Sequence, residues 1–374
     1  MEYRRMPIEV ESPEEKGYSS IKFNLAESSI RDKKISDILP DAFGKGFDDL
    51  ILQYTDHRGN PSLRIAILEE SKGLEISDVL VCQAAAMALF VINTSMLSKE
   101  DHLIVLRPNY ATNIETPRAI GCEISFIDLK FENQYVLDIE EIRWAIQPNT
   151  KLISITTPHN PTGVIISEKT INELIKIAEG KGIYLLVDQT YRELNFKTKI
   201  EPYFAGKSPN VISISSLSKA FGLPGIRIGW IICKDQALME KFLAAKEQII
   251  ICNSVVDEYL AEKALENKAK ILSESHKTLN ENFKIVENWL KNHPNFEWVK
   301  PDAGAIAFIH IKKPVDTQNF YQTLLNTHKT MLGPGHWFEQ SDQFFRLGFG
   351  FPTSQELVEG LRRVDLVINS RLSS

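Results

Sequence analysis

The sequence predicts an α/β protein whose main part is a mostly parallel sheet covered by helices. Between Val79 and Lys234, short β-branched runs alternate with amphipathic segments, which is typical of strands joined by crossover helices. After Cys252 this alternation stops, and longer helical stretches and paired strands indicate a smaller α+β part. We therefore expect a large domain over residues 43–270 and a second domain formed by residues 1–42 with 271–374.

The strands of the large sheet are expected at short apolar runs, which are Val79–Cys82, His102–Arg107, Glu123–Leu129, Lys151–Thr156, Ile183–Val187, Val211–Ser215 and Ile228–Cys233. Between them, Ile139–Ile146 and Glu168–Glu179 repeat apolar residues at a spacing near 3.6, so they are expected to be helices. Ligands of such sheets bind beyond the carboxyl ends of the strands, so the residues after each run are candidate site residues.

The C-terminal part is expected to begin with one long helical stretch from about Ser254 to His293. Two strand-like runs follow at Phe296–Val299 and Ala305–Ile311, and then a helix, a further short strand pair and a terminal helix from Ser354. We expect the first forty or so residues to pack with this part.

Composition limits the classes of function. The 374 residues carry a formal net charge of −6 with acidic and basic side chains interleaved, so no nucleic-acid partner is expected. The charged N-terminus lacks the apolar core of a signal peptide, and the apolar stretch from Ala84 to Leu97 is too interrupted to span a membrane. The cysteines are widely spaced (Cys82, Cys122, Cys233 and Cys252). They are expected to be reduced core residues of a cytoplasmic protein, not part of a disulfide or metal site.

Polar residues follow three of the predicted strands. Asn160 lies in the Pro-His-Asn-Pro-Thr-Gly segment after the run that ends at Thr156, and Asp188 ends the next run with Tyr191 three residues later. The third run leads into Ser216, Leu217, Ser218 and Lys219, with Arg227 eight residues further on; near the C-terminus, Arg346 lies in Phe-Arg-Leu-Gly. Each motif alone has an ordinary explanation, because Asn-Pro-x-Gly is a common turn and an Asp after a strand is often a helix cap.

In this order, the motifs resemble the class I/II aminotransferases of fold type I, which depend on pyridoxal 5'-phosphate (PLP). The resemblance runs from about Phe23 to Phe349. It implies a large domain with a mostly parallel seven-stranded sheet flanked by helices, a smaller α+β domain and PLP as the cofactor. It also implies that Lys219 carries the cofactor and moves the Cα proton, and that Asp188 keeps the ring nitrogen protonated.

The resemblance assigns the other cofactor contacts as well. Asn160 and Tyr191 match the residues that hydrogen-bond the 3-oxygen of the ring, and Tyr110 matches the aromatic that stacks on it. The expected phosphate ligands are Ser216, Arg227 and the backbone N–H groups of Ala85 and Ala86, and Ser218 is expected to bind the cofactor as well. Relatives usually have Gly and Ser or Thr where this chain has alanines. Tyr54 matches the tyrosine that reaches the phosphate of a neighbouring subunit, which implies a homodimer with shared sites.

For the substrate, Arg346 matches the arginine that holds the α-carboxylate, and Asn160 is expected beside it. Ala26 lies in the segment from Asn24 to Ser29, which should shape the side-chain pocket but departs from the usual family pattern. The role of His336, in the turn from Gly333 to Phe338, stays open.

The leading hypothesis is an aminotransferase that moves the α-amino group of an amino acid to a 2-oxo acid. An alternative keeps PLP but gives a β-eliminating or replacing lyase, or a cyclase similar to capreomycidine synthase. A second alternative is a PLP-binding regulatory protein. Such regulators usually carry an extra DNA-binding domain, and only about twenty residues precede the matching region, so we expect this alternative least.

Overall fold

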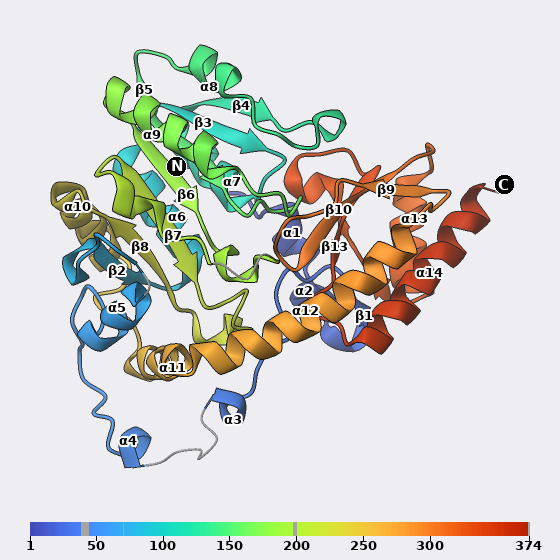
Figure 1. The fold of residues 1–374 in the computed structure, drawn as a ribbon, viewed down its shortest axis with the longest axis horizontal. Helices are drawn as coiled ribbons and strands as arrows, with labels where there is room; N and C mark the ends of the chain where they lie inside the picture. The colour runs from blue at the N-terminus through green and yellow to red at the C-terminus, as the bar shows by residue number, and fades with distance from the viewer. Residues whose placement is uncertain (39–44, 70, 197–199, 373–374) are drawn as a thin grey trace.

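The computed structural model describes residues 1–38, 45–69, 71–196 and 200–372. Its large sheet has seven strands in the order β2-β8-β7-β6-β5-β3-β4 (Figure 1). The strands are β2 (Val79–Cys82), β3 (His102–Arg107), β4 (Glu123–Asp128), β5 (Thr150–Thr156), β6 (Tyr184–Asp188), β7 (Val211–Ser216) and β8 (Gly229–Cys233). All neighbours pair in parallel except β8, which is antiparallel to both β2 and β7. The predicted fold class is therefore confirmed.

Helices cover both faces of this sheet, which explains why its strands, apart from the edge strand β4, are mostly buried. They are α5 (Pro61–Leu68), α6 (Ala84–Met96), α7 (Thr112–Ile120), α8 (Ile139–Ala145), α9 (Glu168–Lys181), α10 (Gln236–Glu247) and α11 (Val255–Glu266). Strand side chains alternate between two cores. Leu185 and Val187 of β6 pack on the side of α8 and α9, and Leu186 packs on the side of α6 and α10.

The register of the strands brings their polar ends to one edge. Asp188 of β6 lies opposite Thr156 of β5. Ser216 of β7 lies opposite Gly229 of β8, which in turn lies opposite Cys82 of β2. Because β8 runs in the opposite direction, its first residue is at the same edge as the last residues of its neighbours.

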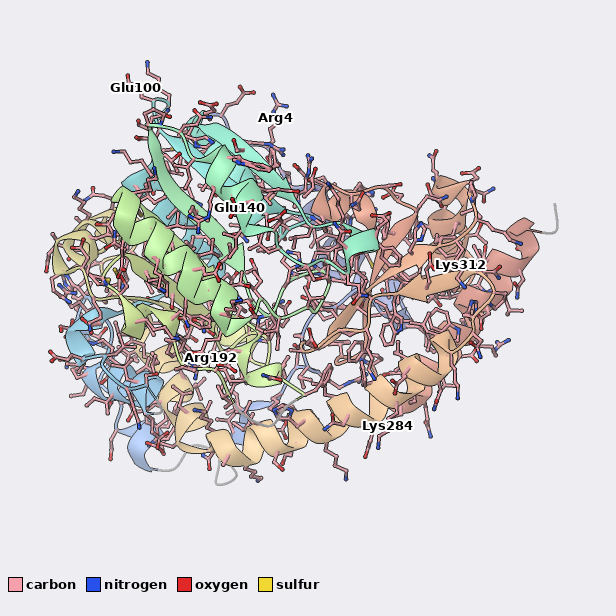
Figure 2. All side chains as sticks on the ribbon, turned by 45° about the horizontal axis from the view of Figure 1, so that its top comes forward. Arg4, Glu100, Glu140, Arg192, Lys284 and Lys312 are labelled. Carbon is pink, nitrogen blue, oxygen red and sulfur yellow. The ribbon has the colours of Figure 1, made fainter. Side chains whose placement is uncertain are left out.

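The smaller part contains an antiparallel sheet in the order β12-β13-β10-β9. Its strands are β9 (Phe296–Trp298), β10 (Ile306–Ile311), β12 (Gly333–Pro334) and β13 (Phe344–Gly348), accompanied by helices α12 (Lys268–Leu290), α13 (Thr317–Asn326) and α14 (Ser354–Leu372). The long α12 carries Lys284 along the outer edge of the molecule, from the large part to the smaller one (Figures 1 and 2).

The N-terminal segment contacts both parts. It contains short helices α1 (Pro7–Val10), α2 (Pro13–Lys16), α3 (Ile35–Ile38) and α4 (Lys45–Asp48), and strand β1 (Phe23–Asn24), which pairs in parallel with β11 (Thr330–Met331) of the smaller part. Near its start, the N–H of Glu2 donates to the carbonyl of Ala119 at 3.2 Å, on the large part. The division into domains at residues 43 and 270 stays a prediction.

The single long helical stretch expected after Cys252 forms two helices. The stretch predicted from Ser254 to His293 is interrupted at Asn267, which separates α11 from α12. The Asn267 side chain donates to the carbonyl of Lys263 at 3.0 Å and so satisfies a carbonyl at the end of α11.

The cysteines are free, but the expectation that all four lie in the core is wrong for Cys252. Cys82, Cys122 and Cys233 are buried, whereas Cys252, between α10 and α11, is only partly buried. Within the described ranges, no helix is long and apolar enough to cross a membrane.

Candidate active site

A cavity of about 310 Å³ lies at the carboxyl-terminal edge of the large sheet. The site residues predicted from the sequence, all except Tyr54, line this cavity, namely Ala26, Ala85, Ala86, Tyr110, Asn160, Asp188, Tyr191, Ser216, Ser218, Lys219, Arg227 and Arg346. They come from positions up to 320 residues apart, as the hydrogen bond between Ala26 and Arg346 illustrates.

Lys219 is placed three residues beyond the end of β7. Its Nζ donates to Ser28 Oγ at 2.9 Å and lies 3.9 Å from Glu27 Oε1. Burial by itself lowers the pKa of Lys219, but Tyr191 and Glu27 outweigh it, and the pKa lies above the usual value. Glu27 responds in the opposite sense. Burial alone would raise the pKa of its carboxyl, yet Lys219 and the N–H of Ser28 hold it below its usual value.

Asp188 is a buried carboxylate at the end of β6. Its Oδ1 accepts hydrogen bonds from the backbone N–H of Thr190, at 3.0 Å, and from the Thr190 hydroxyl. Burial nevertheless raises the pKa of Asp188, against the Thr190 hydrogen bonds and the charge of Lys219. A protonated ring nitrogen beside this carboxylate would stabilise its negative charge.

Arg346 is almost fully buried, with 3% of its surface exposed. Its Nη1 donates to Asn160 Oδ1 at 3.1 Å, its Nη2 donates to the carbonyl of Ala26 at 2.8 Å, and its guanidinium lies 4.8 Å from the ring centre of Phe338. Its Nε has no partner among the described residues. The position of the guanidinium is therefore fixed by three neighbours, while one buried donor remains for a ligand.

A second unpaired polar group belongs to Tyr191. The side chain is 3% exposed, and its hydroxyl has no hydrogen-bond partner within the part of the chain that the structure describes. A buried hydroxyl without a partner costs about 1–3 kcal/mol, so a ligand oxygen at this position would relieve that cost. Tyr110, on the loop after β3, is partly buried at the same cavity.

The amino end of α6 also lines the cavity. Ala84 has a φ of +65°, an uncommon value for a residue other than glycine, as α6 begins. Gly229 is needed there, because a Cβ at this position would lie 2.6 Å from the Ala84 carbonyl carbon and 2.8 Å from the Ala85 nitrogen. Helix N–H groups together with Ser216 and Arg227 are ligands suited to a phosphate. Arg227 is exposed, and its Nη1 donates to the carbonyl of Pro224 at 2.7 Å.

These groups fit PLP in type and number. A carboxylate suits the ring nitrogen, an amine suits the aldehyde carbon, the unpaired Tyr191 hydroxyl suits the ring oxygen, and the helix end suits the phosphate. Because Gly229 has no side chain, β8 packs closely against the first turn of α6, and the end of this helix lies at the cavity. The individual roles assigned from the sequence remain predictions.

Two predicted positions lie elsewhere. Tyr54 is 77% exposed and does not line the cavity. His336 lies in a short turn of helix (Gly335–Phe338), outside the cavity, where its Nδ1 is 2.9 Å from Asp342 and its Nε2 is 3.0 Å from Glu11.

Sequence reasoning missed the contribution of the N-terminal segment. Glu9, Glu14, Glu27 and Asp32 line the cavity, and Ser28 accepts the hydrogen bond of Lys219. The only signal for them was the unusual segment around Ala26, because the acidic residues before it resemble an ordinary solvated terminus.

Comparisons with known proteins agree with this geometry. The family described as aminotransferase class I and II matches residues 20–364. An aspartate aminotransferase of Pyrococcus horikoshii is 27% identical over 87% of this chain and 86% of that protein. A capreomycidine synthase of Streptomyces vinaceus is 25% identical over 85% of this chain and 81% of that protein. A solved PLP-dependent aminotransferase of Streptococcus suis superposes with a TM-score of 0.92 at 28% identity, covering 99% of each chain.

Proposed function

We infer that this chain, which belongs to the class I and II aminotransferase family, is a PLP-dependent enzyme that transfers the α-amino group of an amino acid to a 2-oxo acid. One observation carries this inference: Lys219, Asp188 and Arg346 line the same cavity. Tyr191 lines it too, and its hydroxyl has no partner among the described residues. An amine, a carboxylate and a carboxylate-binding guanidinium are what the reaction needs.

PLP, when bound, supplies an electron-accepting ring for the pair left at Cα when the Cα proton is removed. The chain's own residues do the rest. Asp188 keeps a proton on the ring nitrogen through its negative charge, and Tyr191 and Asn160 donate to the ring oxygen. Lys219 would hold the cofactor and, once it is a free amine, would take the proton from Cα and deliver it to C4′ of the cofactor.

Arg346 orients the substrate. A guanidinium fixed by Asn160, Ala26 and Phe338 can bind a carboxylate without first losing side-chain freedom. Holding the α-carboxylate in one place sets which bond at Cα faces the ring, and removal of the Cα proton requires one particular orientation.

A second candidate reaction is supported by one comparison. The capreomycidine synthase relative matches this chain over most of its length, at an identity close to that of the aspartate aminotransferase. A cyclase or β-eliminating enzyme would use the same Lys219 and Asp188, but a group would leave from Cβ. The residues of the site assign no group to that step, so transamination remains the proposal.

We also propose a cytoplasmic homodimer. The free thiols favour a reducing compartment. The exposed Tyr54, which is absent from its own cavity, supports a role at the phosphate of a second copy.

The experiment that tests this function has two steps. The purified protein with PLP is reduced with borohydride, and a peptide map should find the adduct on Lys219. The unreduced protein is then given single amino acids without a 2-oxo acid. At least one amino acid should abolish the visible absorbance of the bound cofactor, and a 2-oxo acid should restore it. Spontaneous recovery with release of ammonia or a cyclised product would instead identify a lyase or cyclase.

A further inference from the structure

We propose that the amino donor is a basic amino acid, whose side chain ends in an amine or guanidine bound by carboxylates of the N-terminal segment. This rests on the proposed function, because it concerns the substrate side of the same cavity. The carboxylates are Glu9, Glu14, Glu27 and Asp32, referred to below as the acidic rim.

Negative charges outnumber positive charges around the cavity once each Lys and Arg side chain is given its expected partner. Lys219, Arg227 and Arg346 are the only Lys or Arg residues among the described lining, and all three have expected partners in the cofactor or the substrate α-carboxylate. Asp188 faces the ring nitrogen. Among the described residues, Lys219 and Arg31 act on Asp32, and Lys219 and Arg346 act on Glu27. The acidic rim still has an excess of carboxylates when Lys219 and Arg346 take their expected partners, and a substrate cation would balance this excess.

The rim is connected to the carboxylate site. The carbonyl of Ala26, the residue before Glu27, accepts the hydrogen bond of Arg346. Arg346 itself is 3% exposed, with its Nε unpaired among the described residues and its side chain lining the same cavity. This buried donor is an independent sign of an anionic ligand, so a bound α-carboxylate would place the substrate side chain within reach of the rim.

Three of the four rim carboxylates have no ion pair within the described part of the chain. No ion pair joins Glu9, Glu14 or Asp32 to a Lys, Arg or His side chain, and Glu14 makes only a hydrogen bond with the Tyr18 hydroxyl, at 2.8 Å. Burial, Glu27 and Glu14 together raise the pKa of Asp32 by more than Lys219 and Arg31 lower it. The fourth carboxylate, Glu27, lies 3.9 Å from the amine of Lys219. This amine would be bonded to the cofactor whenever Lys219 carries it.

The position of the rim is fixed by contacts outside the cavity. Glu11, between the rim residues Glu9 and Glu14, accepts hydrogen bonds from Trp337 Nε1 at 2.6 Å and lies 3.0 Å from His336 Nε2. These contacts dock α1 and α2 on the smaller part, so Glu9 and Glu14 are held at the cavity. A dicarboxylic donor would place its second carboxylate among these like charges and is disfavoured.

Unreactive analogues test the binding step. Calorimetry with the PLP-loaded protein should compare 5-guanidinopentanoate, hexanoate and adipate, which lack an α-amino group. They share a carboxylate for Arg346 and differ at the far end. The guanidino compound should bind about tenfold more tightly than hexanoate, and adipate more weakly than hexanoate. Equal binding of the guanidino compound and hexanoate, or tightest binding of adipate, would overturn the proposal.

Substitutions test which residues are responsible. In the double variant Glu14→Gln/Asp32→Asn, the ratio of kcat/KM for arginine to that for norleucine should fall about tenfold or more. Glu15→Gln is the matched control, because Glu15 neighbours Glu14 in α2 but pairs with Arg5 at 2.9 Å and does not line the cavity. The ratio should be unchanged in this control, and an unchanged ratio in the double variant contradicts the proposal.

The two levels of inference can fail separately. If no amino acid abolishes the absorbance of the bound cofactor, the proposed function is wrong. If norleucine or glutamate reacts but arginine, ornithine and lysine show no preference over norleucine, the aminotransferase stands and only the basic donor is wrong.

Discussion

At the scale of single residues, the site depends on buried charges that neutral neighbours hold in place. Arg346 and Asp188 are both nearly inaccessible to solvent, and each is held by neutral neighbours, Arg346 by Asn160 and Ala26 and Asp188 by Thr190. A buried ion without a charged partner is costly, so both side chains favour ligands of the opposite charge. A protonated cofactor ring and a substrate carboxylate would supply these charges.

Replacement of Arg346 by alanine should weaken the reaction without loss of cofactor. The lost charge-assisted hydrogen bonds are worth about 1.5–3 kcal/mol, which corresponds to a fall in kcat/KM of about ten- to hundredfold or more. The absorbance of bound PLP should stay unchanged. Arg346→Lys is the control that keeps the charge but loses the planar fork, and it should lie between the wild type and Arg346→Ala. A near-normal kcat/KM in Arg346→Ala would reject the carboxylate role.

At the scale of elements, the phosphate end of the cavity depends on the close packing of β8 on the first turn of α6. Gly229 permits this contact because it has no Cβ, and Ala84 adopts a positive φ at the same point. The helix N-terminus is thereby directed at the cavity with its N–H groups free of side-chain caps.

The variant Gly229→Ala should therefore lose PLP affinity. The added methyl group overlaps the backbone of Ala84 and Ala85, and such overpacking costs about 1–3 kcal/mol. Fluorescence titration with PLP and denaturant unfolding measure the two effects. Gly225→Ala is the matched control, because nothing lies within 4 Å of a Cβ there. If both variants bind PLP equally well, the packing argument is wrong.

A second element-scale contact should depend on pH. The hydrogen bond with Asp342 raises the pKa of His336 against the effect of burial, and Glu11 raises it further. A raised folded-state pKa means that protonated His336 stabilises the docked α1–α2 segment fully below about pH 6.5, and this contribution is lost as the pH rises through the raised value.

Amide hydrogen exchange of residues 7–16, corrected for the intrinsic rate, measures this docking. Protection should fall as the pH rises from 6 to 9 in the wild type. His336→Gln should remove most of this pH dependence, whereas Glu15→Gln, which alters the same segment without touching His336, should keep it. Equal pH dependence in all three proteins would show that His336 does not hold the segment.

At the scale of the whole molecule, one region presents apolar side chains to solvent. Ile51, Leu52 and Tyr54 are exposed, and Ile249 and Ile251 are exposed beyond the end of α10. The loop after Tyr54 is fixed to this helix, because the buried Lys246 of α10 donates to the carbonyl of His57 at 2.6 Å. An exposed apolar region on a fixed backbone is suited to contact with another copy of the chain.

Mixed dimers test this arrangement. Lys219→Ala should remove the cofactor lysine of its own site, and Tyr54→Phe should weaken the phosphate site of the other copy. Co-refolding of the two variants should give hybrids with one site free of both changes, so activity should exceed the mean of the separate variants. A monomer with full PLP occupancy on a sizing column would be decisive against shared sites. As a control, Tyr184→Phe replaces Tyr54→Phe in the same mixing experiment.

Much of the fold could be predicted because its signals are local. β3 spans His102–Arg107, and β2 spans Val79–Cys82, as their apolar runs predict. The side chains that the motifs single out lie close to the ends of such runs, Asp188 at the end of β6 and Lys219 three residues after β7. Parallel strands then bring these strand ends together, so a sequence order becomes a spatial cluster without further information.

The sequence by itself therefore predicted the α/β class and the strands, which depend on neighbours a few positions away, and its motifs singled out many of the residues that line the cavity. Only the tertiary structure decided which residues complete the substrate side. Glu14 and Glu27 join the cavity because the N-terminal segment is held by Glu11 to Trp337, 326 positions away, and because Ala26 accepts from Arg346. Such long-range contacts produce no periodic pattern in the sequence. They depend on how helices and strands pack together after they form, and not on the local residues that form each helix or strand.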